Sequence, residues 1–261
     1  MVKKAGCRKM GVISTDEWLK KDFNRPIQMM EKLKSTFHDS LDGDAIYQQL
    51  LKHGMYSPNQ RTKLTWEYLQ ENDAWKKTQN LFTSYKKLWG GPDVPIYIFP
   101  LMSSWGWKKT NETKSGLAFE DKLFLFYDKE IADKEMEALL IHEYHHVCRL
   151  HRLEKEPKEF TLLDTMIMEG LAERTVERYL GAYYLARWTK LYQEDKLQEF
   201  WSKHLEGKHM IKRTDPLHDV LLLGQKGFPH MLGYCSGFYL VGKSEKISVK
   251  KSFIIQSEEF L

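Results

Sequence analysis

The chain has 261 residues, which is enough for one large domain or two modest ones with a buried core. Hydrophobic residues make up 42% and charged residues 29%, as is typical of globular proteins, and this composition excludes extensive disorder. The 40 basic and 36 acidic residues leave a formal charge of +4, and the basic residues are scattered, so no nucleic-acid partner is indicated. No stretch approaches the roughly 18 apolar residues of a membrane span.

The N-terminus and the cysteines favour a cytoplasmic location. The first residues, Met1–Lys9, are basic, but no apolar segment of signal-peptide length follows them, so we do not expect secretion. The three cysteines are an odd number at wide separations, which favours reduced thiols over a disulfide framework; they are Cys7, Cys148 and Cys235.

Helical periodicity dominates the first third of the chain. From Ser14 to about Trp89, apolar residues recur at helical spacing, and glycine, proline and asparagine interrupt the pattern at several points. We therefore expect a helical N-terminal lobe over residues 1–90, followed by a second domain over residues 91–261.

Short apolar runs after residue 90 predict a small sheet. Ile96–Phe99 resembles a buried strand, and Gly116–Phe119 with Lys122–Tyr127 resembles a hairpin. Because helical patterns follow these strands, the sequence predicts an α+β fold that is mostly helical with a small mixed sheet. A strand of this hairpin, if it lies beside the site, could also pair with an extended peptide through its backbone.

Four helical segments are expected after the strands. One should begin near Asp128 or Asp133 and end near Leu153. The next should begin at Thr161, where Thr161 and Asp164 resemble a capping box, and end at Gly181. An aromatic helix over Tyr183–Phe200 and a short helix over Leu217–Leu223 should follow. The last block, Gly227–Val241, has glycines four residues apart, which would let a helix approach a neighbour closely.

The first of these helices carries the pattern His-Glu-x-x-His at His142, Glu143 and His146. Histidines four residues apart project from one helix face, so both imidazoles can bind one zinc ion. In this known signature the glutamate is the general base that activates a zinc-bound water, so Glu143 is the candidate catalytic base. His145 would compete with His146 for the same face, and we expect it to be an outer or solvated side chain.

A catalytic zinc site needs a third protein ligand. The best candidate is Glu169 on the following helix, where Gly170 would permit a close approach of that helix to the histidine helix. Glu173 lies four residues later, so it could replace Glu169 or accept a hydrogen bond from a ligand imidazole. Asp164 is a further candidate for such support. No histidine follows at the spacing of a three-histidine site, which favours His-His-Glu.

The oxyanion that forms during peptide hydrolysis benefits from a donor besides the metal. The C-terminal block offers Tyr234, His230 and Tyr239. We place Tyr234 first because glycines flank it.

Three segments together resemble a bacterial family of predicted zinc-dependent proteases, a domain family of uncharacterised function: Ile141–His146, Met168–Glu173 and Gly233–Tyr239. The resemblance covers about residues 95–261. It implies a zincin-like core in which the small sheet packs on the metal-binding helix, with Glu143 as base and the glutamate Glu169 as third zinc ligand. Met168 departs from better-known relatives, which have asparagine before the ligand glutamate.

The sequence thus predicts a zinc metallopeptidase that acts on a peptide or protein substrate, and it carries no signal for the oligomeric state. One alternative is a non-catalytic interaction or regulatory protein that retains zinc on a peptidase scaffold. The presence of Glu143 argues against it, since a structural site needs only ligands. A di-iron bundle built from Glu143–His146 and Glu206–His209 is a second alternative, which Gly207 disfavours because it lies in a loop-like stretch.

Overall fold

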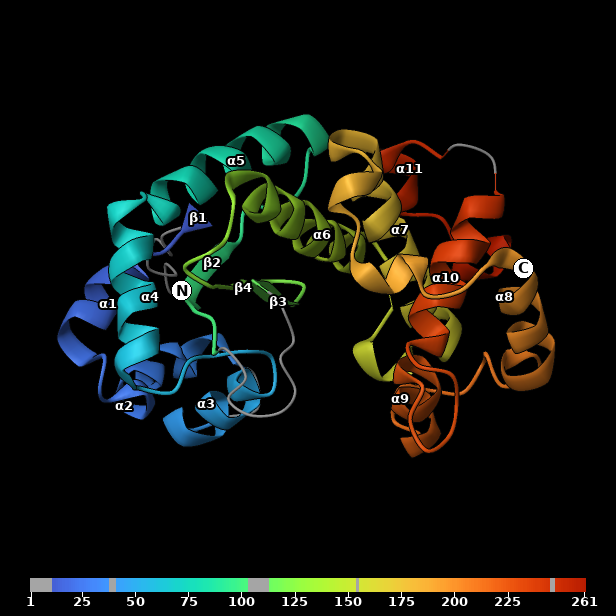
Figure 1. Cartoon of the computed structure of the whole chain (residues 1–261), viewed down its shortest axis with the longest axis horizontal. Coiled ribbons are helices and arrows are strands. Elements are labelled where there is room, and N and C mark those ends of the chain that lie inside the picture. The colour runs from blue at the N-terminus through green and yellow to red at the C-terminus, as the bar shows by residue number, and fades with distance from the viewer. Residues whose placement is uncertain (1–10, 38–40, 103–112, 154, 245–246) are drawn as a thin grey trace, which may run out of the picture. The chain divides into compact units, whose positions relative to one another are not determined.

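A computed structural model describes residues 11–37, 41–102, 113–153, 155–244 and 247–261 (Figure 1). The chain divides into two compact units, Met1–Glu143 and Tyr144–Leu261. The boundary falls inside helix α6 (Asp133–Arg152), and so differs from the boundary near residue 90 that the sequence suggested.

Helices fill most of the first unit before the sheet, which confirms the helical pattern expected from Ser14 to Trp89. They are α1 (Thr15–Asp22), α2 (Pro26–Met30) with a 3₁₀ turn (Glu31–Thr36), α3 (Gly43–Leu51), α4 (Gln60–Glu71) and α5 (Ala74–Trp89). Helix α4 begins with a reciprocal capping box between Asn59 and Thr62, in which each side chain bonds the backbone of the other.

The first unit contains a mixed sheet of four strands in the order β1-β2-β4-β3. The strands are β1 (Gly11–Val12), β2 (Pro95–Pro100), β3 (Lys114–Ala118) and β4 (Leu123–Tyr127). The predicted hairpin is confirmed, since β3 and β4 are antiparallel, whereas β2 runs parallel to both β1 and β4. Strand β1 was not predicted because two residues are too few to show an alternating pattern.

Strands β2 and β4 are buried along their whole lengths. Aromatic residues of these strands pack on apolar residues of α2 and α3, and the rings of Tyr97 and Phe124 stack at 5.0 Å; the cluster includes Met29, Met30, Ile46, Leu50, Phe99 and Phe126. The strands and the N-terminal helices therefore share one core. This shared core joins the N-terminal helices and the sheet in one compact unit.

The second unit is helical. Its elements are a 3₁₀ turn (Pro157–Glu159), α7 (Leu162–Leu180), 3₁₀ turns (Ala182–Tyr184 and Arg187–Lys190), α8 (Glu194–Phe200), a π-helical turn (Trp201–Leu205), α9 (Pro216–Leu223), α10 (Leu232–Lys243), α11 (Val249–Ser252) and a last 3₁₀ turn (Ser257–Phe260). The continuous aromatic helix expected over Tyr183–Phe200 was wrong. The backbone of this segment is extended at Leu185 and Ala186, which interrupts the helix. The N–H of Ala186 donates to the Glu173 carboxylate at 2.9 Å.

Helix α7 is almost entirely buried over its first fourteen residues and runs beside α10 (Figure 1). A methyl group added at Gly170 would lie 2.5 Å from the carbonyl oxygen of Gly237, and one added at Gly237 would lie 2.5 Å from the carbonyl carbon of Met166. The two backbones therefore meet through glycine. We expected Gly170 to permit a close approach to the histidine helix. The helix that approaches it closely is α10.

Two cysteines are free and buried in the second unit, Cys148 and Cys235, and Cys7 lies outside the described residues. Burial raises the pKa of each described thiol to about 12, so both are protonated and inert at neutral pH. Among the helices in the described ranges, none has the length and apolar character needed to cross a bilayer.

Substitution of Gly237 by alanine should destabilise the protein by at least the roughly 1–3 kcal/mol typical of an overpacked core, because the new methyl group would collide with the backbone of α7. Equilibrium denaturation in urea measures this change. Ser236→Ala is the matched control on the same buried helix. Its hydroxyl has no hydrogen-bond partner among the described residues, so its removal should cost little. Equal losses in both variants would contradict the account of the α7–α10 contact.

Candidate metal centre

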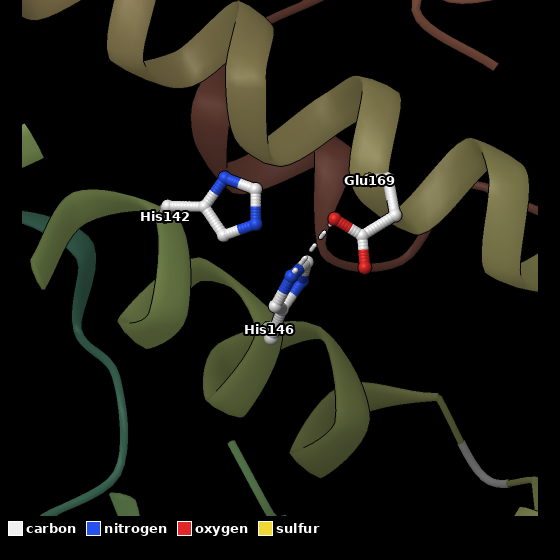
Figure 2. Close-up of side chains that lie close together, drawn as sticks. All are labelled: His142, His146 and Glu169. Carbon is white, nitrogen blue, oxygen red and sulfur yellow. Dashed lines mark ion pairs between the residues drawn. The ribbon is translucent and has the colours of Figure 1, made fainter. Parts of the chain in front are cut away.

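Helix α6 carries the two histidines of the motif. Asp133 and Glu135 lie in its first turn, and Arg149 and Arg152 lie in its last turn, so charges of both signs stabilise the helix dipole. His142 and His146 are one turn apart on this helix, as the spacing predicted. Figure 2 shows their rings facing a common space with the carboxylate of Glu169, which comes from α7.

The three side chains form a group that could hold a metal ion. One ligand atom from each of His142, His146 and Glu169 lies within 4.8 Å of the other two. The Oε2 atom of Glu169 is 3.6 Å from Nε2 of His146. This separation exceeds an ordinary hydrogen bond and is close to the roughly 3.4 Å expected between two ligand atoms that surround a tetrahedral zinc ion at about 2.0–2.1 Å.

The chemistry of the donor set also fits zinc. Two imidazoles and one carboxylate form one of the usual ligand sets of catalytic zinc, and they leave one position for water. The side chains of His146 and Glu169 are only 7% and 11% exposed, so a bound ion would be largely shielded from solvent. In the part of the chain that the structure describes, this is the one such group of histidine, cysteine and acidic residues.

The di-iron alternative gains nothing from the structure. Glu206 and His209 lie in a turn after the π-helical segment, not on a long helix, and neither belongs to the metal-ligand group. A di-iron bundle needs its Glu-x-x-His motifs on facing helices.

His145 is a buried side chain that contacts the C-terminal part of the chain. It is fully buried, its Nε2 atom lies 2.8 Å from Oγ of Ser252, and its ring packs at 5.0 Å on Phe253. Of the two positions expected for His145, outer or solvated, burial excludes the solvated one. His145 is not a member of the candidate ligand group among the described residues. No local pattern could indicate this contact, since Ser252 lies 107 residues further along the chain.

Arg149, one turn after His146, joins α6 to residues 252–257, the C-terminal segment that also contacts His145. Its guanidinium is buried and donates to the carbonyl oxygens of Ser252 at 2.7 Å and Ile255 at 2.9 Å, and to Oγ of Ser257 at 3.3 Å. Burial lowers the pKa of Arg149 to about 10, so the group remains charged at neutral pH. The C-terminal segment is thereby fixed to the half of α6 that follows the motif.

Asp164 contacts groups other than the zinc ligands. Its carboxylate accepts hydrogen bonds from the backbone of Thr161, from Oγ of Ser257 and from Nζ of Lys155, and the predicted capping box is confirmed. Although burial opposes ionisation, these bonds hold the pKa of Asp164 below its usual value. Asp164 therefore caps the start of α7 and links this helix to the C-terminal segment. We had expected it to support a ligand imidazole.

Glu173 lies one turn after Glu169 on α7 and is 4% exposed. Its carboxylate accepts the hydrogen bond from the N–H of Ala186, so it fixes the chain that follows the helix. It is not part of the ligand group, in which Glu169 is the carboxylate.

Tyr234 lies on α10, one turn before Gly237, where α10 meets α7 beside Glu169. It is half-buried, and its ring packs edge-on against Trp188 at 5.2 Å. The alternative Tyr239 uses its hydroxyl to accept a hydrogen bond from Gln198 at 2.7 Å within the core of the second unit. His230 precedes α10 in a turn. Of the three candidates, we still predict that Tyr234 is the residue that donates a hydrogen bond to the oxyanion.

Comparison with known proteins agrees with this site. The family model described as "Predicted Zn-dependent protease (DUF2268)" matches residues 74–261, which include all three candidate ligands. The chain is also 40% identical over 222 residues to "Uncharacterized protein YjaZ" of Bacillus subtilis (strain 168), an alignment that covers 81% of this chain and 83% of that protein. No solved structure matches the chain. The chain therefore belongs to this family of predicted zinc-dependent proteases.

Proposed function

We propose that the protein is a zinc metallopeptidase that hydrolyses peptide bonds with Glu143 as its general base. The observation that carries this proposal is the convergence of His142, His146 and Glu169 within 4.8 Å, with Glu143 next to the first ligand on the same helix. A structural zinc site would need the ligands but no adjacent carboxylate.

His142, His146 and Glu169 would hold the ion. Zinc, when bound, polarises the scissile carbonyl and lowers the pKa of the attacking water toward neutrality. Glu143 takes the proton of that water on its carboxylate and later delivers it to the leaving amine. Its side chain is 8% exposed, so bulk water competes little for this proton.

Tyr234 is our candidate for a second donor to the oxyanion. A phenol hydroxyl that donates to the developing negative charge would stabilise the transition state more than the bound substrate. Support for this role comes from the position of Tyr234 on α10, near the contact of that helix with the segment of α7 that carries Glu169.

The proposed substrate is a peptide or protein segment in extended form. In the sheet as described, β3 is an edge strand with β4 on one side only. Its backbone could therefore pair with an extended chain, an arrangement that also fits the zincin-like core implied by the resemblance. Strand β3 and the half of α6 that bears Glu143 belong to the same compact unit.

A cytoplasmic location is part of the proposal. It is supported by the free, buried thiols of Cys148 and Cys235, since reduced cysteines are typical of reducing compartments. Cell fractionation followed by immunoblotting tests the location.

Replacement of Glu143 by glutamine should lower peptide cleavage by about 10²–10⁴-fold, because an amide cannot accept the proton. Zinc content should stay at the wild-type value, because the three ligands are unchanged. Cleavage of a broad peptide library and elemental analysis measure the two quantities. Full activity of the variant would exclude Glu143 as the base, and a wild-type protein that binds zinc but cleaves nothing would favour the non-catalytic alternative.

Replacing each of the two carboxylates of α7 should weaken zinc binding to a different extent. Glu169→Ala should weaken binding by more than about 100-fold, because it removes a ligand. Glu173→Ala should weaken it by no more than about 10–100-fold, the range for residues that only support a ligand. Competition with a chromogenic chelator measures both affinities. Unchanged zinc affinity in Glu169→Ala, with loss in Glu173→Ala, would reverse the assignment of the third ligand.

A further inference from the structure

We infer that Gly116 is a positioning residue for catalysis: the absence of a side chain on strand β3 creates the space in which the Glu143 carboxylate is held. This inference rests on the proposed role of Glu143 as general base. It concerns a residue outside the histidine motif and outside the ligand set.

Strand β3 lies along the first half of α6. Lys114 forms an ion pair with the carboxylate of Glu135 and also contacts the carbonyl oxygen of that residue at 3.4 Å. Side chains alternate along a strand, so the position of Gly116 faces α6 on the same side as Lys114. Ser115 faces away from the helix and donates to the carbonyl oxygen of His53 at 2.7 Å.

The space at Gly116 is occupied by Glu143. A methyl group added there would lie 2.5 Å from Oε1 of Glu143 and would also collide with Cγ and Cδ of that side chain. Real Cβ atoms essentially never come within 3.0 Å of another atom, so one of the two residues would have to move. The Glu143 side chain thus packs directly against the backbone of β3.

Backbone conformation does not explain the glycine. Gly116 is not among the glycines with positive φ, so alanine could adopt the same conformation. Glycine in a strand interior lowers stability, and its presence often marks a close approach of another group. At this position the close group is the carboxylate that we propose as the base.

A methyl group at residue 116 should displace Glu143 and leave the strand in place. Gly116 is paired with Leu125 of the fully buried strand β4, and the ion pair of Lys114 fixes the strand to α6. The glutamate side chain, by contrast, can rotate about its single bonds. Displacement of a catalytic group by about 1 Å can cost about 10²-fold in rate.

The test combines Gly116→Ala with Glu143→Ala in the full-length, zinc-loaded protein. Gly116→Ala alone should lower kcat by about 10²-fold with little change in KM and with zinc content unchanged. It should also lower the melting temperature, because the methyl group and Glu143 compete for one space. In the Glu143→Ala background the same methyl group enters vacated space, so the melting temperature should stay constant or rise.

The melting temperatures test the contact independently of peptidase activity. An equal decrease in both backgrounds would show that the methyl group strains the strand itself, and would overturn the inference. Unchanged kcat in Gly116→Ala, with loss of cleavage in Glu143→Gln, would overturn the inference and leave the proposed function intact. If the wild type cleaves no peptide but the melting temperatures are coupled, the proposed function fails and the contact stands. Ser84→Ala, on the exposed face of α5, should keep the wild-type kcat.

Discussion

The site depends on one short approach between two helices, the 3.6 Å between Nε2 of His146 on α6 and Oε2 of Glu169 on α7. A carboxylate is costly to bury unless a positive partner faces it, and a zinc ion between these atoms would supply that charge. The site therefore requires, above all, that α7 hold Glu169 close to His146. Glycine contacts with α10 fix the middle of this helix, and the bond from Ala186 to Glu173 fixes the chain that leaves it.

The two helices are also connected through the C-terminal segment. Arg149 of α6 binds Ser252, Ile255 and Ser257, and Ser257 binds Asp164 at the start of α7. The hydrogen bonds from its two terminal nitrogens offset part of the cost of burying the charged guanidinium, and they favour one conformation of the segment. The last residues of the chain thus restrain the beginning of α7 relative to the second half of α6. The relative position of His146 and Glu169 then follows from contacts that lie outside the ligand set.

Local signals in the sequence were sufficient for much of this structure. The histidine spacing placed two candidate ligands on one helix face, the Thr161–Asp164 pattern located the start of α7, and apolar runs located the hairpin. Contacts between distant segments were not predictable. The partners of His145 and Arg149 lie more than 100 residues away, and Gly170 meets α10 because of tertiary packing that no local pattern encodes. The aromatic residues after Gly181 have helical spacing, but the backbone is extended at Ala186, where the N–H donates to Glu173, so no continuous helix forms.

The most direct test is a crystal structure of the zinc-loaded protein with anomalous data collected at the zinc absorption edge. The account predicts one ion bound to nitrogen atoms of His142 and His146 at about 2.0–2.1 Å and to a carboxylate oxygen of Glu169 at about 2.0–2.2 Å, with a fourth position open to water. An anomalous peak elsewhere would contradict it, as would an ion that is bound by Glu173 in place of Glu169.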